Sequence, residues 1–170
     1  LIGGSGTVLT LDLQQRVDHL DRSVIAGQQD PQAVLSEYKA LAKKYPQEPI
    51  ALAAYAEALR RVGQAKESAE VLRPMIRGRN IQDLSDPVFM AYMRLLLGQG
   101  FFTDVQDRVQ QRLSMAQSPD PQLYNLLGVA YAGQNKREDA EKAFNQALAG
   151  WNGRPGVVEE NIAKLKTSKE

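Results

Sequence analysis

Few residues of this chain have types that could do chemistry, and they are scattered. His19 is the single histidine, and there is no cysteine. A Ser–His–Asp triad needs an activated serine on a strained elbow such as Gly-x-Ser-x-Gly, which the chain lacks. One histidine, with neither cysteines nor an EF-hand loop, also makes no metal-ligand set. We interpret His19 as a helix-surface or groove residue. We expect no enzymatic activity, no metal and no cofactor.

Charged residues occur in short clusters that favour helices over catalysis. Lys43-Lys44 and Arg60-Arg61 could attract anions, but positive charge is also stabilising at a helix C-terminus. Glu160 and Lys164 have the i, i+4 spacing of a helix-supporting pair. The formal net charge is +1, so bulk electrostatics do not draw the chain to nucleic acid or to anionic membranes. We expect neither a nucleic-acid partner nor a small-molecule substrate.

The elements that must position any functional side chain follow a recurrent pattern near the end of the chain. The pattern is an aromatic residue, Leu-Gly and Tyr at spacings of three, then a small residue and Phe four apart: Tyr124-x-x-Leu127-Gly128-x-x-Tyr131 and Ala140-x-x-x-Phe144. It resembles the tetratricopeptide repeat (TPR), a helix-turn-helix unit, with Tyr in place of the usual Trp. The resemblance implies a scaffold that binds protein segments.

Local signals place the two helices of this unit. Asp120 has the residue type of an N-cap, and Pro121 suits the first helical position. Asn135 can adopt the left-handed turn that separates the first helix from a second one over about residues 137–149. Gly128 lacks a Cβ, so it should let the neighbouring helix approach closely.

The same template fits three earlier segments less well. Unit starts near Gln15, Pro49, Asp86 and Pro121 are 34, 37 and 35 residues apart, close to the TPR length. We therefore predict an all-α, right-handed TPR-like solenoid of about four repeats, at residues 15–48, 49–82, 86–119 and 121–154. One domain would span residues 8–168, with residues 156–167 as an amphipathic C-terminal capping helix. The glycine-rich residues 1–7 are interpreted as a flexible linker, native or added.

The predicted binding surface is the concave face, which the first helix of each TPR unit lines. Positions between the core residues should point into this groove, and we select Glu57, Arg60, Met90, Arg94, Leu97, Gln122, Asn125 and Val129. Arg60, Arg94 and Asn125 would supply hydrogen-bond donors, while Met90 and Val129 would supply apolar contact. Such a mixed surface suits an extended or helical peptide that carries a few carboxylates.

A narrower resemblance is to the TadD family, outer-membrane lipoproteins of the bacterial tight-adherence (Tad) pilus system. Two segments carry it, Leu123–Tyr131 and Trp151-x-Gly-Arg-Pro155-x-x-Val158-x-x-Asn161. The resemblance implies a pilotin-like role, with a secretin or another pilus-assembly subunit as partner, at the periplasmic face of the outer membrane. The lipid-bearing cysteine of that family is absent. Because the chain begins at Leu1 and not Met, we expect a processed or trimmed chain, with membrane attachment only through an anchor upstream.

Two other interpretations remain open. The chain could be a generic TPR adaptor or co-chaperone in the cytoplasm, although the co-chaperones that clamp a C-terminal carboxylate use a denser Lys/Asn/Arg set. It could also be an accessory TPR domain cut from a larger enzyme. The residues encoded upstream of Leu1 would distinguish these interpretations. A signal peptide ending in Cys favours the lipoprotein, and a catalytic domain favours the accessory domain of an enzyme.

Overall fold

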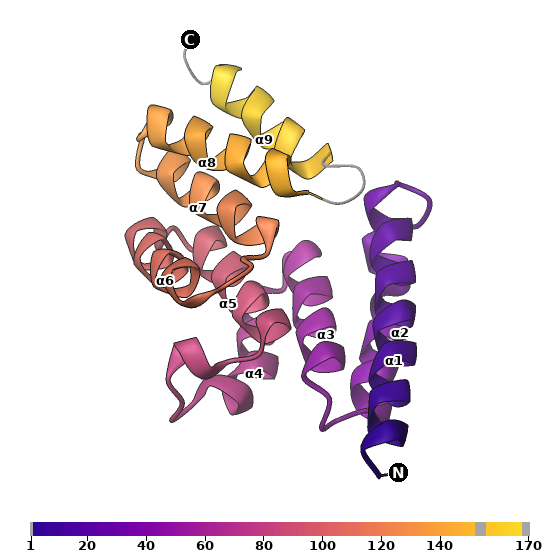
Figure 1. Cartoon of the computed structure of the whole chain (residues 1–170). Coiled ribbons are helices and arrows are strands. Elements are labelled where there is room, and N and C mark those ends of the chain that lie inside the picture. Colours follow the sequence, from indigo (N-terminus) through magenta and orange to yellow (C-terminus); the bar gives the residue numbers. More distant parts are fainter. Residues whose placement is uncertain (1, 152–155, 168–170) are drawn as a thin grey trace. The chain divides into compact units, whose positions relative to one another are not determined.

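The computed structural model describes the backbone of residues 2–151 and 156–167, with side chains from residue 12 onward. Within these ranges the chain forms nine α-helices and one short 3₁₀ helix, and no strand (Figure 1). It divides into two compact units, residues 1–95 and 96–170. Residues 152–155, which include Gly153–Pro155 of the closing sequence pattern, lie outside the described residues, as does residue 168 at the end of the predicted domain.

The first unit consists of helices that pack as antiparallel neighbours. They are α1 (Ile2–Ile25), α2 (Pro31–Lys44), α3 (Pro49–Arg61), α4 (Ala65–Ile76), η1 (Ile81–Asp83) and α5 (Asp86–Gly98) as far as Leu95. Helix α3 packs against both α2 and α4, and α1 packs against α2 and α3. The core between α1, α2 and α3 contains Leu13, Val17, Leu20, Val34, Tyr38, Ala51, Ala54 and Ala58.

Small residues set the close approach of α3 and α4. Ser68 on α4 is 1% exposed, and its hydroxyl donates a hydrogen bond to the carbonyl oxygen of Ala56 on α3 at 2.7 Å. Gly63, at φ +84°, makes the tight turn between the two helices, in a backbone region that residues with a Cβ rarely adopt.

The second unit contains α6 (Phe102–Met115), α7 (Pro121–Gly133), α8 (Arg137–Gly150) and α9 (Gly156–Thr167). The Asp120 side chain accepts a hydrogen bond from the Gln122 backbone N–H at 2.9 Å, which confirms the predicted N-cap. Asn135 has φ +60°, as the turn prediction requires. Gly128 is buried, and a Cβ placed there would overlap the ring of Phe144, which confirms its role as a packing glycine.

The start of the chain differs from the expectation drawn from its composition. Residues 2–7 were expected to be a linker, but they form the first turns of α1. Glycine disfavours helix by about 1 kcal/mol relative to alanine. Extending an existing helix is easier than nucleating one, however, because each added residue brings one hydrogen bond. The amphipathic segment that follows, with Leu13 and Val17 in the core, supplies that helix.

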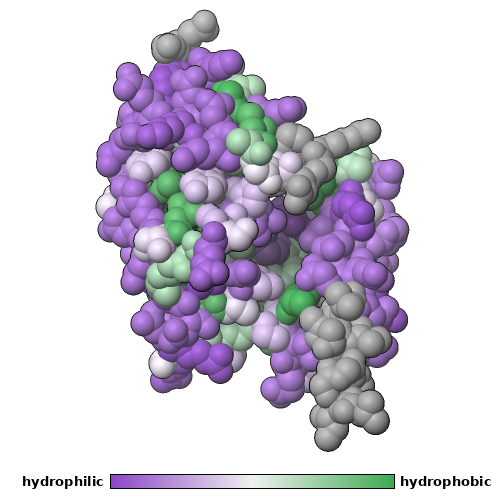
Figure 2. Space-filling model, in the orientation of Figure 1, coloured by the Kyte–Doolittle hydropathy of each residue, from purple (hydrophilic) through white to green (hydrophobic). Residues whose placement is uncertain are grey.

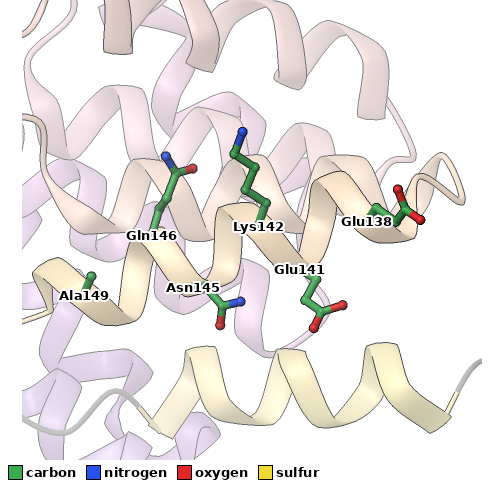
Figure 3. Close-up of a pocket in the computed structure, with 6 residues that line it drawn as sticks. All are labelled: Glu138, Glu141, Lys142, Asn145, Gln146 and Ala149. Atoms are coloured by element: carbon green, nitrogen blue, oxygen red, sulfur yellow. The ribbon is translucent and has the colours of Figure 1, made fainter.

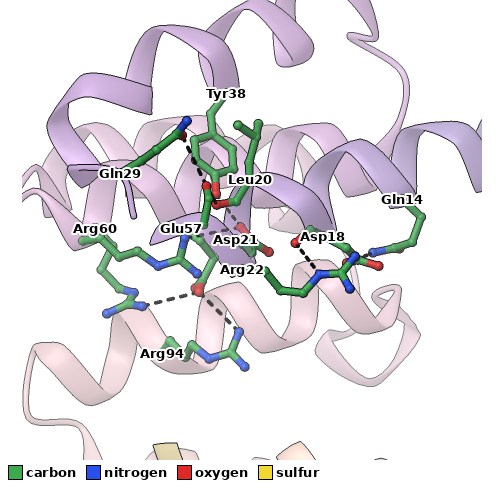
Figure 4. A network of polar contacts seen from close by, with 12 residues as sticks. Gln14, Asp18, Leu20, Asp21, Arg22, Gln29, Tyr38, Glu57, Arg60 and Arg94 are labelled. Atoms are coloured by element: carbon green, nitrogen blue, oxygen red, sulfur yellow. Dashed lines mark hydrogen bonds and ion pairs between the residues drawn. The ribbon is translucent and has the colours of Figure 1, made fainter. Parts of the chain in front are cut away.

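A partly buried polar network joins α1, α2 and α3 (Figure 4). The Tyr38 hydroxyl donates a hydrogen bond to Asp21 Oδ1 at 2.5 Å, and Arg61 Nη1 lies 3.4 Å from the same oxygen. Tyr38 is 1% exposed. Burial, followed by the hydrogen bond to Asp21, raises the pKa of the Tyr38 phenol well above its ordinary value.

This raised pKa predicts a loss of stability at high pH. The phenol titrates near pH 10 in the unfolded chain, so its contribution is complete below about pH 10 and is lost as pH rises through the higher folded pKa. We expect Tyr38→Phe to cost about 1 kcal/mol at neutral pH, because one buried hydrogen bond is lost. The variant should also flatten the fall in unfolding free energy between about pH 10 and 11.

Urea unfolding at a series of pH values measures both effects. Tyr55→Phe is the matched control, since Tyr55 packs against the same core but is only partly buried. Equal alkaline slopes for the wild-type chain and Tyr38→Phe would contradict the assignment.

Candidate functional site

Three of the predicted groove residues meet in the first unit. Glu57 and Arg60 lie on α3, and Arg94 lies on α5. Glu57 Oε2 accepts from Arg60 Nη2 at 3.4 Å and from Arg94 Nη1 at 3.3 Å (Figure 4). The Glu57 side chain is 11% exposed, whereas those of Arg60 and Arg94 are 31% and 29% exposed. We call these three residues the Glu57 cluster.

The hydrogen bonding of the Glu57 cluster is incomplete. Within the described residues, Glu57 Oε1 and Arg60 Nε are buried without a hydrogen-bond partner. A buried polar atom left unpaired costs about 1–3 kcal/mol. The two atoms have opposite polarity, one accepting and one donating, so a single peptide group offers a complement to each. Both atoms are shielded from solvent, so the side chains around them would have to move before such a group could reach them.

Met90 requires a correction. The prediction gave it exposed apolar contact in the groove, but it is 6% exposed and belongs to the core. The reason is the composition of α5, where every residue from Val88 to Leu96 except Tyr92 and Arg94 is buried. A helix that is apolar on most sides is covered on more than one face, so a single exposed stripe cannot be inferred from it. Leu97 is partly buried near the end of α5, and its residue belongs to the second unit.

In the second unit, α9 occupies the predicted face of α7. Asn161 Nδ2 donates to Asn125 Oδ1 at 3.0 Å, and Val129 packs against a cluster that includes Val158 and Leu165. Gln122, at the start of α7, is partly exposed. The sequence predicted both a capping helix and a partner-binding face on α7. In the structure the capping helix contacts Asn125 and Val129, two of the residues predicted to bind the partner. The regular apolar spacing of Val158, Ile162 and Leu165 was the signal for this packing.

A hollow of about 520 Å³ lies between α1 and α2. Its rim mixes charges of both signs, and Leu20 and Leu41 contribute its apolar lining. Arg16 Nε lies 3.3 Å from Asp12 Oδ2, so one basic and one acidic group of the rim already pair. The charged and titratable residues around it are Asp12, Arg16, His19, Glu37 and Lys44. His19 therefore lines a surface hollow, consistent with its interpretation as a groove or surface residue.

The outer face of α8 is a different kind of surface. A space of about 510 Å³ beside it is lined by residues of this one helix: Glu138, Glu141, Lys142, Asn145, Gln146 and Ala149. Figure 3 shows their side chains projecting to different sides of the helix, without converging on a common point. Hydrophilic residues also dominate the surface drawn in Figure 2, where hydrophobic residues form separate small patches. We interpret the α8 face as solvated helix surface.

The described residues contain no group of three or more His, Asp or Glu side chains placed to hold a metal ion. No helix in this part of the chain is both long and apolar enough to cross a bilayer.

The stacked antiparallel helices of the two units place the chain in the class of TPR-like helical solenoids, a fold that generally serves protein interaction. No protein-family model matches the chain, and no curated protein does. Among solved structures, a chain titled "MamA RS-1 ArsTM double mutant" is similar, with 17% sequence identity and a TM-score of 0.48 over 94% of this chain and 97% of that one. A likeness this weak transfers no property, so the class rests on the helices themselves.

Proposed function

We propose that this chain is a non-catalytic scaffold that holds a segment of a partner protein on the face formed by α3 and α5. The Glu57 cluster carries the proposal. It presents two partly exposed guanidinium groups next to a buried carboxylate, and its Glu57 Oε1 and Arg60 Nε lack partners among the described residues.

The cluster favours a polar peptide over an apolar one. A carboxylate on the partner would approach Arg60 and Arg94, and charge-assisted hydrogen bonds of this kind are about twice as strong as neutral ones. A peptide group of the same segment would pair with the two unsatisfied atoms. Truncating a centrally placed arginine at such an interface commonly has a large effect on binding.

The narrower form of the proposal is a pilotin-like assembly factor of the Tad pilus system, which binds a secretin or pilus subunit at the periplasmic face of the outer membrane. It is supported by the sequence resemblance over Leu123–Tyr131 and around Trp151. This narrower proposal is tested by reading the sequence that the gene encodes upstream of Leu1. A signal peptide followed by a lipid-bearing cysteine would support it, and a leaderless or catalytic upstream segment would contradict it.

Site-specific photocrosslinking tests the broader proposal. A photoreactive amino acid is placed at residue 60 of the chain expressed in its native cell, and at residue 142 on the α8 face as the control. We expect residue 60 to yield a crosslink to one defined segment of one protein, with no such product from residue 142. Equal labelling from both positions, or none from residue 60, would contradict the proposal.

A further inference from the structure

A second hollow in the first unit lies between α4 and α5 and involves none of the Glu57 cluster. Its volume is about 220 Å³, and its lining includes Leu72, Ile76, Tyr92 and Leu95. Leu72 and Leu95 are 1% and 4% exposed, so they form a floor, whereas Tyr92 is partly exposed. Small-molecule sites usually measure about 300–1,000 Å³. This hollow is smaller and suits one apolar side chain better than a cofactor.

Two arginines border this apolar floor. Arg73 lies in the last turn of α4 and Arg77 is the C-cap residue, whose backbone N–H donates to the Arg73 carbonyl oxygen. Both residues are exposed and both line the hollow. Across the described ranges, neither guanidinium has a carboxylate within 4.0 Å.

The helix macrodipole accounts for part of this arrangement, since positive charge is favourable at a helix C-terminus. It does not account for two guanidinium groups at the edge of a hollow with an apolar floor. Guanidinium groups bind carboxylates in a bidentate geometry that lysine cannot reproduce. A ligand that complements this hollow would therefore carry negative charge at the rim and an apolar group in the centre.

We propose that this hollow docks an acidic segment of a partner protein, with one apolar side chain in the hollow and neighbouring carboxylates on Arg73 and Arg77. We name the two arginines and their apolar floor the Arg73 hollow. Apolar burial would supply affinity, while the paired charges would orient the segment and make binding sensitive to salt. The inference goes beyond the proposed function, because it concerns a separate surface and holds whether or not the Glu57 cluster binds a partner.

The test is a selection from a random peptide library displayed on phage, carried out against the wild-type chain and against the Arg73→Gln/Arg77→Gln variant. On the wild type we expect enrichment of peptides with an apolar residue flanked by acids, and on the variant no such enrichment. A synthetic copy of the leading peptide should bind the variant at least tenfold more weakly. Its amide shift changes in the ¹⁵N-labelled wild-type chain should centre on residues 69–77 and 92–95.

Lys43→Gln/Lys44→Gln is the matched control, since it removes two positive charges from the last turn of α2. This variant should keep the wild-type enrichment. Selected peptides without acids, or equal enrichment on wild type and Arg73→Gln/Arg77→Gln, would overturn the inference. Amide shift changes around residues 57–60 that persist in Arg73→Gln/Arg77→Gln would overturn docking at the Arg73 hollow. They would support partner binding at the Glu57 cluster. The opposite result, binding at the Arg73 hollow with no crosslink from residue 60, would overturn only the proposed function.

Discussion

Replacement of Gly128 by leucine is expected to lower the free energy of unfolding by about 1–3 kcal/mol, the usual range for overpacking a close helix contact. Any Cβ at residue 128 would overlap the Phe144 ring. Phe144 is 1% exposed and packs in a core with Ala140 and Ala147, so its ring has little room to move away. Helices α7 and α8 would therefore have to separate.

A matched pair of alanine variants isolates this contact. A Cβ at Gly98 meets nothing within 4 Å, and the residue has no positive φ, so Gly98→Ala should be neutral or stabilising. Gly128→Ala should destabilise, although alanine is the better helix former. Adding Phe144→Ala to Gly128→Ala removes the overlapping ring. The double variant should therefore lose less stability than the sum of the losses in the two single variants. Urea unfolding of the variants measures all of these differences. Unchanged stability in both Gly128 variants would show that the helices do not depend on this glycine.

Local signals in the sequence were sufficient for this part of the fold. The N-cap at Asp120, the left-handed Asn135 and the small residue at Gly128 each depend on neighbours a few positions away or on one repeat pattern. The Tyr38–Asp21–Arg61 network was not predicted, because it joins three helices whose residues are up to 40 positions apart. Periodicity places each residue on a helix face but does not say which polar groups meet across faces.

The candidate site shows the same division. Glu57, Arg60 and Arg94 were selected from their helix positions, and the structure adds that they share one carboxylate oxygen. The burial of Met90 could not be predicted, because it depends on how many neighbours cover α5. The sequence pattern likewise does not show that Asn161 of α9 donates a hydrogen bond to Asn125.

A charge reversal at residue 94 is expected to weaken partner binding more than the same reversal on the outer face of α8. Arg94→Glu replaces a guanidinium by a second carboxylate beside Glu57, so an acidic partner segment would meet repulsion instead of attraction. We expect the dissociation constant for the crosslinked partner to rise at least tenfold, about 1.4 kcal/mol. Helix content should be unchanged, since most of the core of the first unit is apolar, but the loss of the Arg94–Glu57 ion pair should lower the melting temperature. Circular dichroism and a thermal melt measure both effects, and binding is compared at a temperature at which both chains are folded.

The control for this reversal is Lys142→Glu, which makes the same change of charge on the exposed α8 face. Titration calorimetry of the wild-type chain and these two variants with the partner segment is the most direct measurement of whether the α3–α5 face is the binding surface. We expect a loss of affinity of tenfold or more for Arg94→Glu and a change of less than about twofold for Lys142→Glu. Wild-type affinity in Arg94→Glu, with the loss appearing in Lys142→Glu, would contradict binding at the α3–α5 face and place the partner on α8.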